Sequence, residues 1–202
     1  MQEKNHIIIF AKQPIAGSVK TRLIATLGAD AAANLSTKLC QHTINIAVKA
    51  GYPIHLFCHP NSQYPLFLEN QKRYALHLHQ QQGDDLGQRL AHAFRKVFTK
   101  ADRVIAIGSD CPVLEVEYLH EAIDALENKA EVVLGPAEDG GYVLIGMQHF
   151  YPELFKKIPW STDKVLQVTQ ERIQSQKLSS VQLSTLWDVD VESDLIRLKE
   201  LK

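Results

Sequence analysis

Residues 6–23 have the sequence HIIIFAKQPIAGSVKTRL, in which a continuous apolar run passes directly into a basic loop. An apolar run without alternation is typical of a strand that is covered on both faces, as in a parallel sheet. Ligands of such sheets bind beyond the carboxyl ends of the strands. The loop carries Lys12, Lys20 and Arg22, and Gly17 permits a compact turn whose N–H groups can face an anion. We therefore predict that this loop binds the phosphates of a nucleotide.

Two common phosphate-binding motifs do not fit this loop. A Walker A loop has a glycine directly before its lysine, whereas Val19 precedes Lys20 here. No GxGxxG pattern follows the apolar run, so a dinucleotide-binding turn is not supported. The alternative to phosphate binding is a basic loop that only faces solvent. The position of the loop, at the edge where such folds bind ligands, favours phosphate binding.

The rest of the chain alternates short β-rich runs with longer helical patterns. In residues 84–98, Leu86, Leu90, Phe94 and Phe98 recur at every fourth position, which is typical of an amphipathic helix. The patterns predict, in order, helix 29–49, strands 53–58 and 75–79, helix 84–98, strand 103–107, helix 115–126, strands 131–134 and 142–147, helix 162–173, strand 181–186 and helix 192–201. This order predicts one α/β domain over residues 1–202, a three-layer α/β/α sandwich with a mostly parallel central sheet.

Composition excludes several classes of partner. The chain has 202 residues, of which 45% are hydrophobic and 22% are charged, as in ordinary globular domains. Its net charge of -1 gives no overall attraction to nucleic acid or to an anionic membrane. The three cysteines form no CxxC, and no apolar run approaches the roughly 20 residues that span a bilayer. We expect a soluble, cytoplasmic protein with reduced thiols. A homodimer formed at an edge of the sheet is compatible with the sequence.

An aspartate follows one of the buried-type strands. Asp110 lies in the sequence GSDCP, directly after residues 103–107, so an apolar strand places its carboxylate at the ligand-binding edge. Carboxylate oxygens are suitable ligands for Mg²⁺ or Mn²⁺, and such a metal neutralises phosphate charge. The alternative is an aspartate that only caps the next helix. That helix is predicted to begin nearer Glu115, which favours the metal.

A second pair of aspartates precedes the last helix, in the sequence WDVD. Asp190 is predicted either to be the N-cap of that helix or to be a second metal ligand facing Asp110. Asp188 is the alternative second ligand. The nine histidines are scattered, and we interpret them as surface or core residues.

Glu138, Asp139 and Gly140 belong to the glycine-rich loop GPAEDGGY, which follows another apolar strand. Carboxylates accept hydrogen bonds from hydroxyl groups, so these residues are predicted to contact the acceptor. A two-glycine turn between strands is the alternative. In the sequence GDDLGQR, Asp84 or Asp85 is expected to cap a helix.

Arg89, one turn into that helix, is a candidate for binding an anion at the helix N-terminus. Further N-caps are expected at Asp30 for helix 29–49, and at Ser161 or Thr162 for helix 162–173.

Six motifs in order resemble the bacterial family DUF2064, from about Ile7 to Leu195. They are FAKQPIAGSVKTRL, GDDLGQR, GSDCP, GPAEDGGYVLIG, PWST and WDVDVESDL. Members of that family are described as candidate glycosyltransferases of the GT-A fold, in the nucleotide-diphospho-sugar transferase superfamily. The chain is also similar, more distantly, to 2-phospholactate guanylyltransferases and molybdenum-cofactor nucleotidyltransferases, which share a basic first loop and an aspartate after a central strand.

The resemblance implies roles for particular residues. Lys12, Lys20 and Arg22 resemble the phosphate-binding residues, Asp110 resembles the metal-binding aspartate, and Asp190 resembles the late second ligand. GSDCP has one carboxylate where glycosyltransferases usually have DxD, which points away from ordinary glycosyl transfer. Residues 191–195 are VESDL where Thr-Pro-Glu-Asp-Leu is usual, so the Thr-Pro cap is lost.

Taken together, the residues and the resemblance predict an Mg²⁺- or Mn²⁺-dependent transferase that acts on a nucleotide sugar or an NTP and on a small acceptor. Asp110 and Asp139 are the predicted catalytic residues, which would act by positioning and by stabilising charge. Glycosyl transfer would release a nucleoside diphosphate, whereas nucleotidyl transfer would release pyrophosphate. A third possibility is a non-catalytic nucleotide-binding module, which would keep Lys20 and Arg22 but would not need Asp110.

Overall fold

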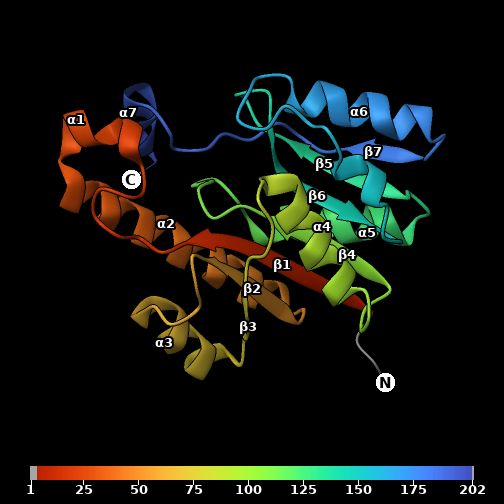
Figure 1. The fold of residues 1–202 in the computed structure, drawn as a ribbon, viewed down its shortest axis with the longest axis horizontal. Coiled ribbons are helices and arrows are strands. Elements are labelled where there is room, and N and C mark those ends of the chain that lie inside the picture. Colours follow the sequence, from red (N-terminus) through yellow and green to blue (C-terminus); the bar gives the residue numbers. More distant parts are fainter. Residues whose placement is uncertain (1–3, 202) are drawn as a thin grey trace.

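One twisted sheet runs through the computed structural model, which describes residues 4–201, and helices cover both of its faces (Figure 1). The order of the seven strands across the sheet is β3-β2-β1-β4-β6-β5-β7. Their bounds are β1 Asn5–Lys12, β2 Ile54–His59, β3 His77–Gln80, β4 Arg103–Ile107, β5 Val132–Pro136, β6 Tyr142–Met147 and β7 Ser180–Gln182.

The helices form two layers and one cluster at an end of the molecule. Their bounds are α1 Ile24–Leu27, α2 Ala29–Ala50, α3 Pro65–Tyr74, α4 Leu86–Val97, α5 Val116–Glu127, α6 Val165–Ser175 and α7 Glu192–Glu200, with 3-10 turns η1 Thr21–Leu23 and η2 Pro152–Phe155. Helices α2, α3 and α5 share one apolar core with the sheet, and α4, η2 and α6 share the other. Figure 1 shows α1 and α7 beside each other, where Leu27 and Leu198 join a small third cluster.

The sheet is mostly parallel, as predicted. β1 pairs in parallel with β2 and β4, β2 with β3, and β5 with β7. Only β6 is antiparallel to its two neighbours, β4 and β5. The other six strands therefore point in one direction, and the loops that follow them emerge at the same edge of the sheet.

The first strand shows why its apolar run has no alternation. Ile7 and Ile9 lie in the core shared with α2 and α5, whereas Ile8 lies in the core shared with α4. All three side chains are fully buried. Because successive side chains of a strand point to opposite faces, a central strand between two helical layers needs apolar residues at every position.

The structure corrects the predicted elements at several places. Helix α3 was not predicted, because among its apolar side chains only Phe67 is buried, and its other buried residue, Asn70, is polar. The amide of Asn70 exchanges hydrogen bonds of 2.9 Å with Gln41 of α2, a contact that only the fold creates. Strand β7 ends at Gln182 and not at residue 186. Leu183 and Leu186 still donate backbone hydrogen bonds to β5, but in an interrupted ladder.

Two of the predicted N-caps are wrong. Helix α2 begins after Gly28, so Asp30 lies within its first turn. Helix α6 begins at Val165, and Thr162 instead accepts a hydrogen bond from the N–H of Lys164 before the helix. The predicted cap of α4 is confirmed, since the Asp85 carboxylate accepts the N–H of Gln88 at 2.7 Å.

Leu86, at the start of the predicted apolar stripe of α4, is 42% exposed. It lies in the first turn, where the helix extends past the core. Cys40, Cys58 and Cys111 are free and buried. Within residues 4–201, no helix has the length and apolar character needed to cross a bilayer.

Candidate active site

Loops from distant parts of the sequence meet at the carboxyl edge of the sheet. They follow β1, β4, β5 and β7. The N–H of Val189 donates to the carbonyl of Asp110 at 3.1 Å, and the N–H of Glu138 donates to the carbonyl of Leu186 at 3.0 Å. These two bonds hold the segment before α7 against the loops that follow β4 and β5. The predicted acidic residues are therefore brought to one place by the backbone.

An ion pair between Lys20 and Asp110 lies at the centre of this edge. The ammonium of Lys20 is 2.9 Å from a carboxylate oxygen of Asp110. The Lys20 side chain is only 6% exposed, whereas that of Asp110 is 43% exposed and remains open to a ligand. The backbone of Lys20 is left-handed, with φ 48° and ψ 40°, a conformation that costs free energy for any residue except glycine. Backbone strain and a buried charge therefore coincide at Lys20.

Asp188 is the third charged group of this centre. It is half-buried, in a segment where Trp187 and Val189 are buried and point into the protein. Burial, and then the nearby carboxylate of Asp110, raise its pKa from 3.8 to about 7, although the Lys20 ammonium acts in the opposite direction. Asp139 and Asp190 also contribute to the raised pKa, so both lie within electrostatic range. The carboxylates near Asp188 therefore outnumber the one buried ammonium, that of Lys20, which acts on it.

Asp190 emerges on the same side of the segment as Asp188 but has a different partner. One of its carboxylate oxygens is 2.6 Å from a guanidinium nitrogen of Arg22, and both side chains are more than half exposed. The prediction that Asp190 is the N-cap of α7 is wrong, because Val191 occupies that position. The carboxylate of Asp194 accepts the N–H groups of Asp190 and Val191, each at 2.8 Å. Asp194 thereby supplies one half of a capping box, whereas Val191, at the N-cap, has no side-chain oxygen that could accept the N–H of Asp194.

A second basic group surrounds the end of β2. Lys12 and His59 are partners across the β1–β2 ladder, and a guanidinium nitrogen of Arg89 is 3.4 Å from Nδ1 of His59. Arg89 also donates from Nε to the carbonyl of Gly83 at 2.9 Å, which orients it. Burial, Arg89 and Lys12 together lower the pKa of His59. Lys12 donates to the carbonyl of Ser18 at 2.6 Å, so this group is joined to the first loop.

The glycine-rich loop after β5 forms a tight turn. The carboxylate of Asp139 accepts the N–H of Gly141 at 2.9 Å. Gly140 has φ 86°, and a Cβ at this position would lie 2.2 Å from the carbonyl oxygen of Asp163, so only glycine fits. The two-glycine turn between β5 and β6 is thus present, and it also fixes the direction of the Asp139 carboxylate.

Glu138, predicted to contact an acceptor, has a structural partner. It accepts two hydrogen bonds from the guanidinium of Arg197 in α7, at 2.7 and 3.0 Å. This guanidinium lies 4.3 Å from the centroid of the Trp187 ring. These contacts hold α7 against residues 187–190, the segment that carries Asp188 and Asp190. Gly17, by contrast, lies at the tip of the first loop with φ 80° and permits the turn there.

The acidic centre fits a divalent metal in one particular way. Within residues 4–201, no three His, Cys, Asp or Glu side chains converge on a single metal position. Mg²⁺, however, is commonly held by one or two carboxylates, with phosphate oxygens and water as its other ligands. Asp110 and Asp188 match that requirement, because a cation beside them would favour the ionised form that burial now disfavours. Asp190, the predicted second ligand, pairs with Arg22, and its role as a metal ligand stays a prediction.

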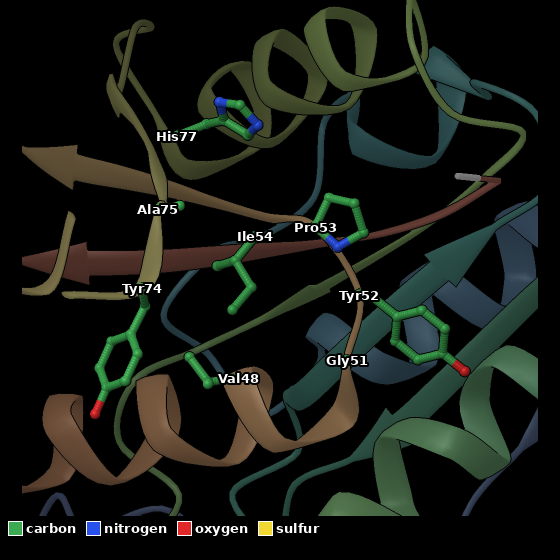
Figure 2. A pocket seen from close by; sticks show the side chains of 8 residues that line it. All are labelled: Val48, Gly51, Tyr52, Pro53, Ile54, Tyr74, Ala75 and His77. Atoms are coloured by element: carbon green, nitrogen blue, oxygen red, sulfur yellow. The ribbon is translucent and has the colours of Figure 1, made fainter. Parts of the chain in front are cut away.

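A hollow on the opposite edge does not compete with this site. It encloses about 380 Å³ and lies at the amino end of β2. Figure 2 shows that Val48 and Ile54 point into it, whereas Tyr52, Tyr74 and His77 point away from one another. Binding sites place several polar groups so that they converge on a ligand. This hollow lacks that convergence.

The geometry agrees with the comparisons with known proteins. The model of the family DUF2064, described as an uncharacterized protein conserved in bacteria, matches residues 43–162. The chain belongs to this family. None of the curated proteins compared with the chain matches it.

Solved structures of similar fold support the assignment. A crystal structure from Desulfovibrio desulfuricans G20, named as a candidate nucleotide-diphospho-sugar transferase, shares 34% identity over 97% of this chain and 86% of its own, with a TM-score of 0.89. The 4-diphosphocytidyl-2C-methyl-D-erythritol synthase of Anaerococcus prevotii DSM 20548 is 10% identical over 100% of this chain and 99% of its own, with a TM-score of 0.63. Rv0371c of Mycobacterium tuberculosis H37Rv, crystallised with manganese, is 17% identical over 99% and 100%, with a TM-score of 0.59. The chain described here thus has the fold of nucleotide-diphospho-sugar transferases and nucleotidyltransferases, as the sequence predicted.

Sequence reasoning missed or underrated three residues of this edge. His59 carries no motif, and only the β1–β2 register places it beside Lys12. Arg197 lies in a charged helix where it resembles any exposed residue. Asp188 was only the alternative to Asp190. The alternation in WDVD was the available signal, because an extended segment with two buried apolar residues points both aspartates to the open side.

Proposed function

We propose that the protein is a divalent-metal-dependent transferase that binds a nucleotide sugar or an NTP and transfers a group to a small acceptor. The observation that carries this proposal is the buried Lys20 ammonium, 2.9 Å from Asp110 and beside Asp188, at the carboxyl edge of a parallel sheet. The description of the relative that is 34% identical supports the same class of reaction. We also infer that residues 1–202 act as one domain, because one sheet contains all seven strands of the described part.

We assign the phosphates to the basic groups around the first loop. Lys20 is buried beside Asp110, and Arg22 pairs with Asp190 at the exposed rim. Lys12 and Arg89 approach from the end of β2. Asp110 and Asp188 would hold Mg²⁺ or Mn²⁺ together with phosphate oxygens. The metal would supply neutralisation of the charge that develops on the leaving phosphate.

We assign the acceptor to the Asp139 side of the candidate site. Oδ1 of Asp139 accepts the N–H of Gly141, so the carboxylate is held in one orientation before the acceptor binds. Its Oδ2 is the oxygen that would accept the hydrogen bond of an acceptor hydroxyl. Gly140 keeps this part of the chain close to Asp163. Glu138 would act from beside it, by holding Arg197 and α7 in place.

Nucleotidyl transfer is the second candidate reaction, and one observation favours it. GSDCP contains a single carboxylate, and the second, Asp188, comes from a distant part of the chain, so no DxD is present at this point. In nucleotidyl transfer the acceptor phosphate attacks the α-phosphorus of an NTP and pyrophosphate leaves. In glycosyl transfer the acceptor attacks the anomeric carbon and a nucleoside diphosphate leaves.

A thermal-shift screen of NTPs and nucleotide sugars, with and without Mn²⁺, tests the proposal. A ligand at 100 times its Kd stabilises the native state by about 2.7 kcal/mol. In a chain of this size that corresponds to a rise in Tm of roughly 5–10 °C. Asp110→Asn should lose the Mn²⁺-dependent part of the shift, whereas Glu171→Gln, an exposed carboxylate on α6, should keep it.

The products then separate the reactions. Release of pyrophosphate from an NTP and an acceptor would exclude glycosyl transfer as the reaction. Release of a nucleoside diphosphate from a nucleotide sugar would exclude nucleotidyl transfer. Unchanged nucleotide affinity of Asp110→Asn in Mg²⁺, together with no turnover of any nucleotide, would instead indicate a non-catalytic binding module.

A further inference from the structure

Four histidines from three adjacent strands gather on the face of the sheet that α4 covers. His6 of β1 and His55 of β2 are both buried, at 6% and 3% exposure. Nδ1 of His6 lies 2.9 Å from Nε2 of His55, and Nδ1 of His55 lies 3.1 Å from Nε2 of His79 in β3. The ring of His77 stacks on His55, with centroids 4.8 Å apart. In Figure 2 the His77 ring projects away from the hollow on the other side of the strand.

The spacing of these rings follows from the parallel register. His55 is the ladder partner of His77, and Phe57 is the partner of His79. Because every second residue of a strand points to the same face, His77 and His79 lie on one side of β3. Both hydrogen bonds run diagonally across the ladders, because His6 and His79 each lie two residues from the ladder partner of His55 on their own strand. They connect β1, β2 and β3 through side chains. They do not form a metal site, since no three such side chains of residues 4–201 converge on one position.

Two adjacent rings of this chain of rings cannot both be doubly protonated while the hydrogen bond between them lasts. Each of the two hydrogen bonds requires one nitrogen without a proton. Both nitrogens of His55 take part, so a protonated His55 donates both bonds and needs Nδ1 of His6 and Nε2 of His79 to be without protons. Protonation of His55 together with His79 must therefore break the bond between these two rings.

The surroundings oppose even the first proton. Among the described residues, the titratable groups that act on His55 are His6, His77, His79 and Lys100, and those that act on His79 are Lys96, His77, Lys100 and His92. They come from β1, β3, α4 and the turn after α4, and all of them are bases. Burial first, and then these bases, lower the pKa of His55 to about 3 and that of His79 to about 4.

We propose that His6, His55 and His79 form a proton-sensitive latch, which joins β3 and β2 to β1 while its rings are neutral and releases the β3 edge in acid. Unfolded histidine titrates near pH 6.5, and His55 and His79 titrate below that value in the folded protein, so the unfolded chain binds more protons at these two positions. Stability supplied by the latch is complete above about pH 6.5 and is lost as the pH falls below it. Release of the β3 edge would also disturb the nucleotide site, as far as that site rests on the proposed function. The reason is that Gln81, directly after β3, donates hydrogen bonds to the carbonyls of Ala11 in β1 and Phe57 in β2.

Urea unfolding between pH 7.5 and pH 5 tests the latch. Each depressed histidine raises the unfolding equilibrium constant about tenfold per pH unit below pH 6. His79→Phe, which keeps a ring against Phe57, should therefore show a tenfold weaker increase per pH unit than the wild type. His55→Phe should behave in the same way. His120→Phe, which replaces a half-buried histidine bonded to the carbonyl of Ala50, should keep the wild-type increase.

If His55→Phe does not fold, the His79→Phe variant and measurements on the wild type still test the latch. His79→Phe changes a half-buried edge residue, so its slope against pH is the primary readout. NMR titration of the wild type should show two histidine rings that remain neutral at pH 5, and amide exchange of β3 should lose protection in acid before that of β4. A wild-type slope equal to that of His79→Phe, or rings that all titrate near pH 6.5, would overturn the latch.

Discussion

Replacing Asp188 with asparagine should stabilise the protein in the absence of ligands at pH 8 and should abolish its response to Mg²⁺. The pKa of Asp188 is raised from 3.8 to about 7 by burial and by Asp110. Each pKa unit corresponds to about 1.36 kcal/mol, so ionising this carboxylate in the native state costs up to about 4 kcal/mol. Asparagine has nearly the same shape and carries no charge, so it removes that cost.

The sign of the pH dependence follows from linkage. Between pH 3.8 and about 7, native Asp188 keeps a proton that the unfolded chain has lost, so wild-type stability falls as the pH rises through this window. The advantage of Asp188→Asn over the wild type should therefore grow from pH 4 to pH 7 and then level off. Urea unfolding of both proteins at matched pH values measures this difference, and the histidine latch cancels because both proteins contain it.

Asp190→Asn is the matched control, two residues away on the same segment. Its carboxylate pairs with Arg22 at an exposed position, so the substitution should lower stability by at most about 1 kcal/mol. A difference between Asp188→Asn and the wild type that does not change with pH would refute the reasoning, because Asp188 would then be ionised without cost. A retained Mg²⁺ response would refute its assignment as a metal ligand.

Three further outcomes are expected. Lys20→Met leaves Asp110 without its cation, and because that carboxylate is partly exposed the loss of stability should be about 1–2 kcal/mol in urea unfolding, with at least a tenfold loss of nucleotide affinity by calorimetry. Gly140→Ala combines a left-handed backbone with a Cβ 2.2 Å from the Asp163 carbonyl and should lower stability by about 2–4 kcal/mol, whereas Gly108→Ala, whose Cβ meets no described atom within 4 Å, should change it by less than about 1 kcal/mol. Chelation of divalent metal should remove the Tm rise that nucleotide produces in the wild type and should have no further effect on Asp110→Asn; a wild-type rise that survives chelation would exclude a metal role.

The fold could be predicted largely because its signals are local. The buried strand β1 needs apolar residues at every position, and α4 needs them on one face, so both patterns are visible along the chain. Helix α3 lacked such a signal. It is held by Phe67 and by the amide pair between Asn70 and Gln41, and an amide in a sequence gives no indication of a partner 29 residues away.

The candidate site was predicted as a set of loops but not as a set of contacts. Sequence position placed Lys20 and Asp110 at the same edge, and the structure joins them in one ion pair. The pairing of Glu138 with Arg197 and the electrostatic interaction of Asp188 with Asp110 depend on how the last segment crosses the sheet edge. That path is set by backbone hydrogen bonds such as the one from Val189 to Asp110.

The sequence by itself determined the α/β class, the mostly parallel sheet and the basic and acidic loops, because these follow from periodicity and from residue type within short windows. Only the tertiary structure decided which charges meet. It buries the Lys20 ammonium against Asp110, gives Asp188 its raised pKa and aligns His6, His55 and His79 across three strands. The physical reason is that desolvation and Coulomb energy depend on distance and burial in space, and strand register sets both for residues far apart in the chain.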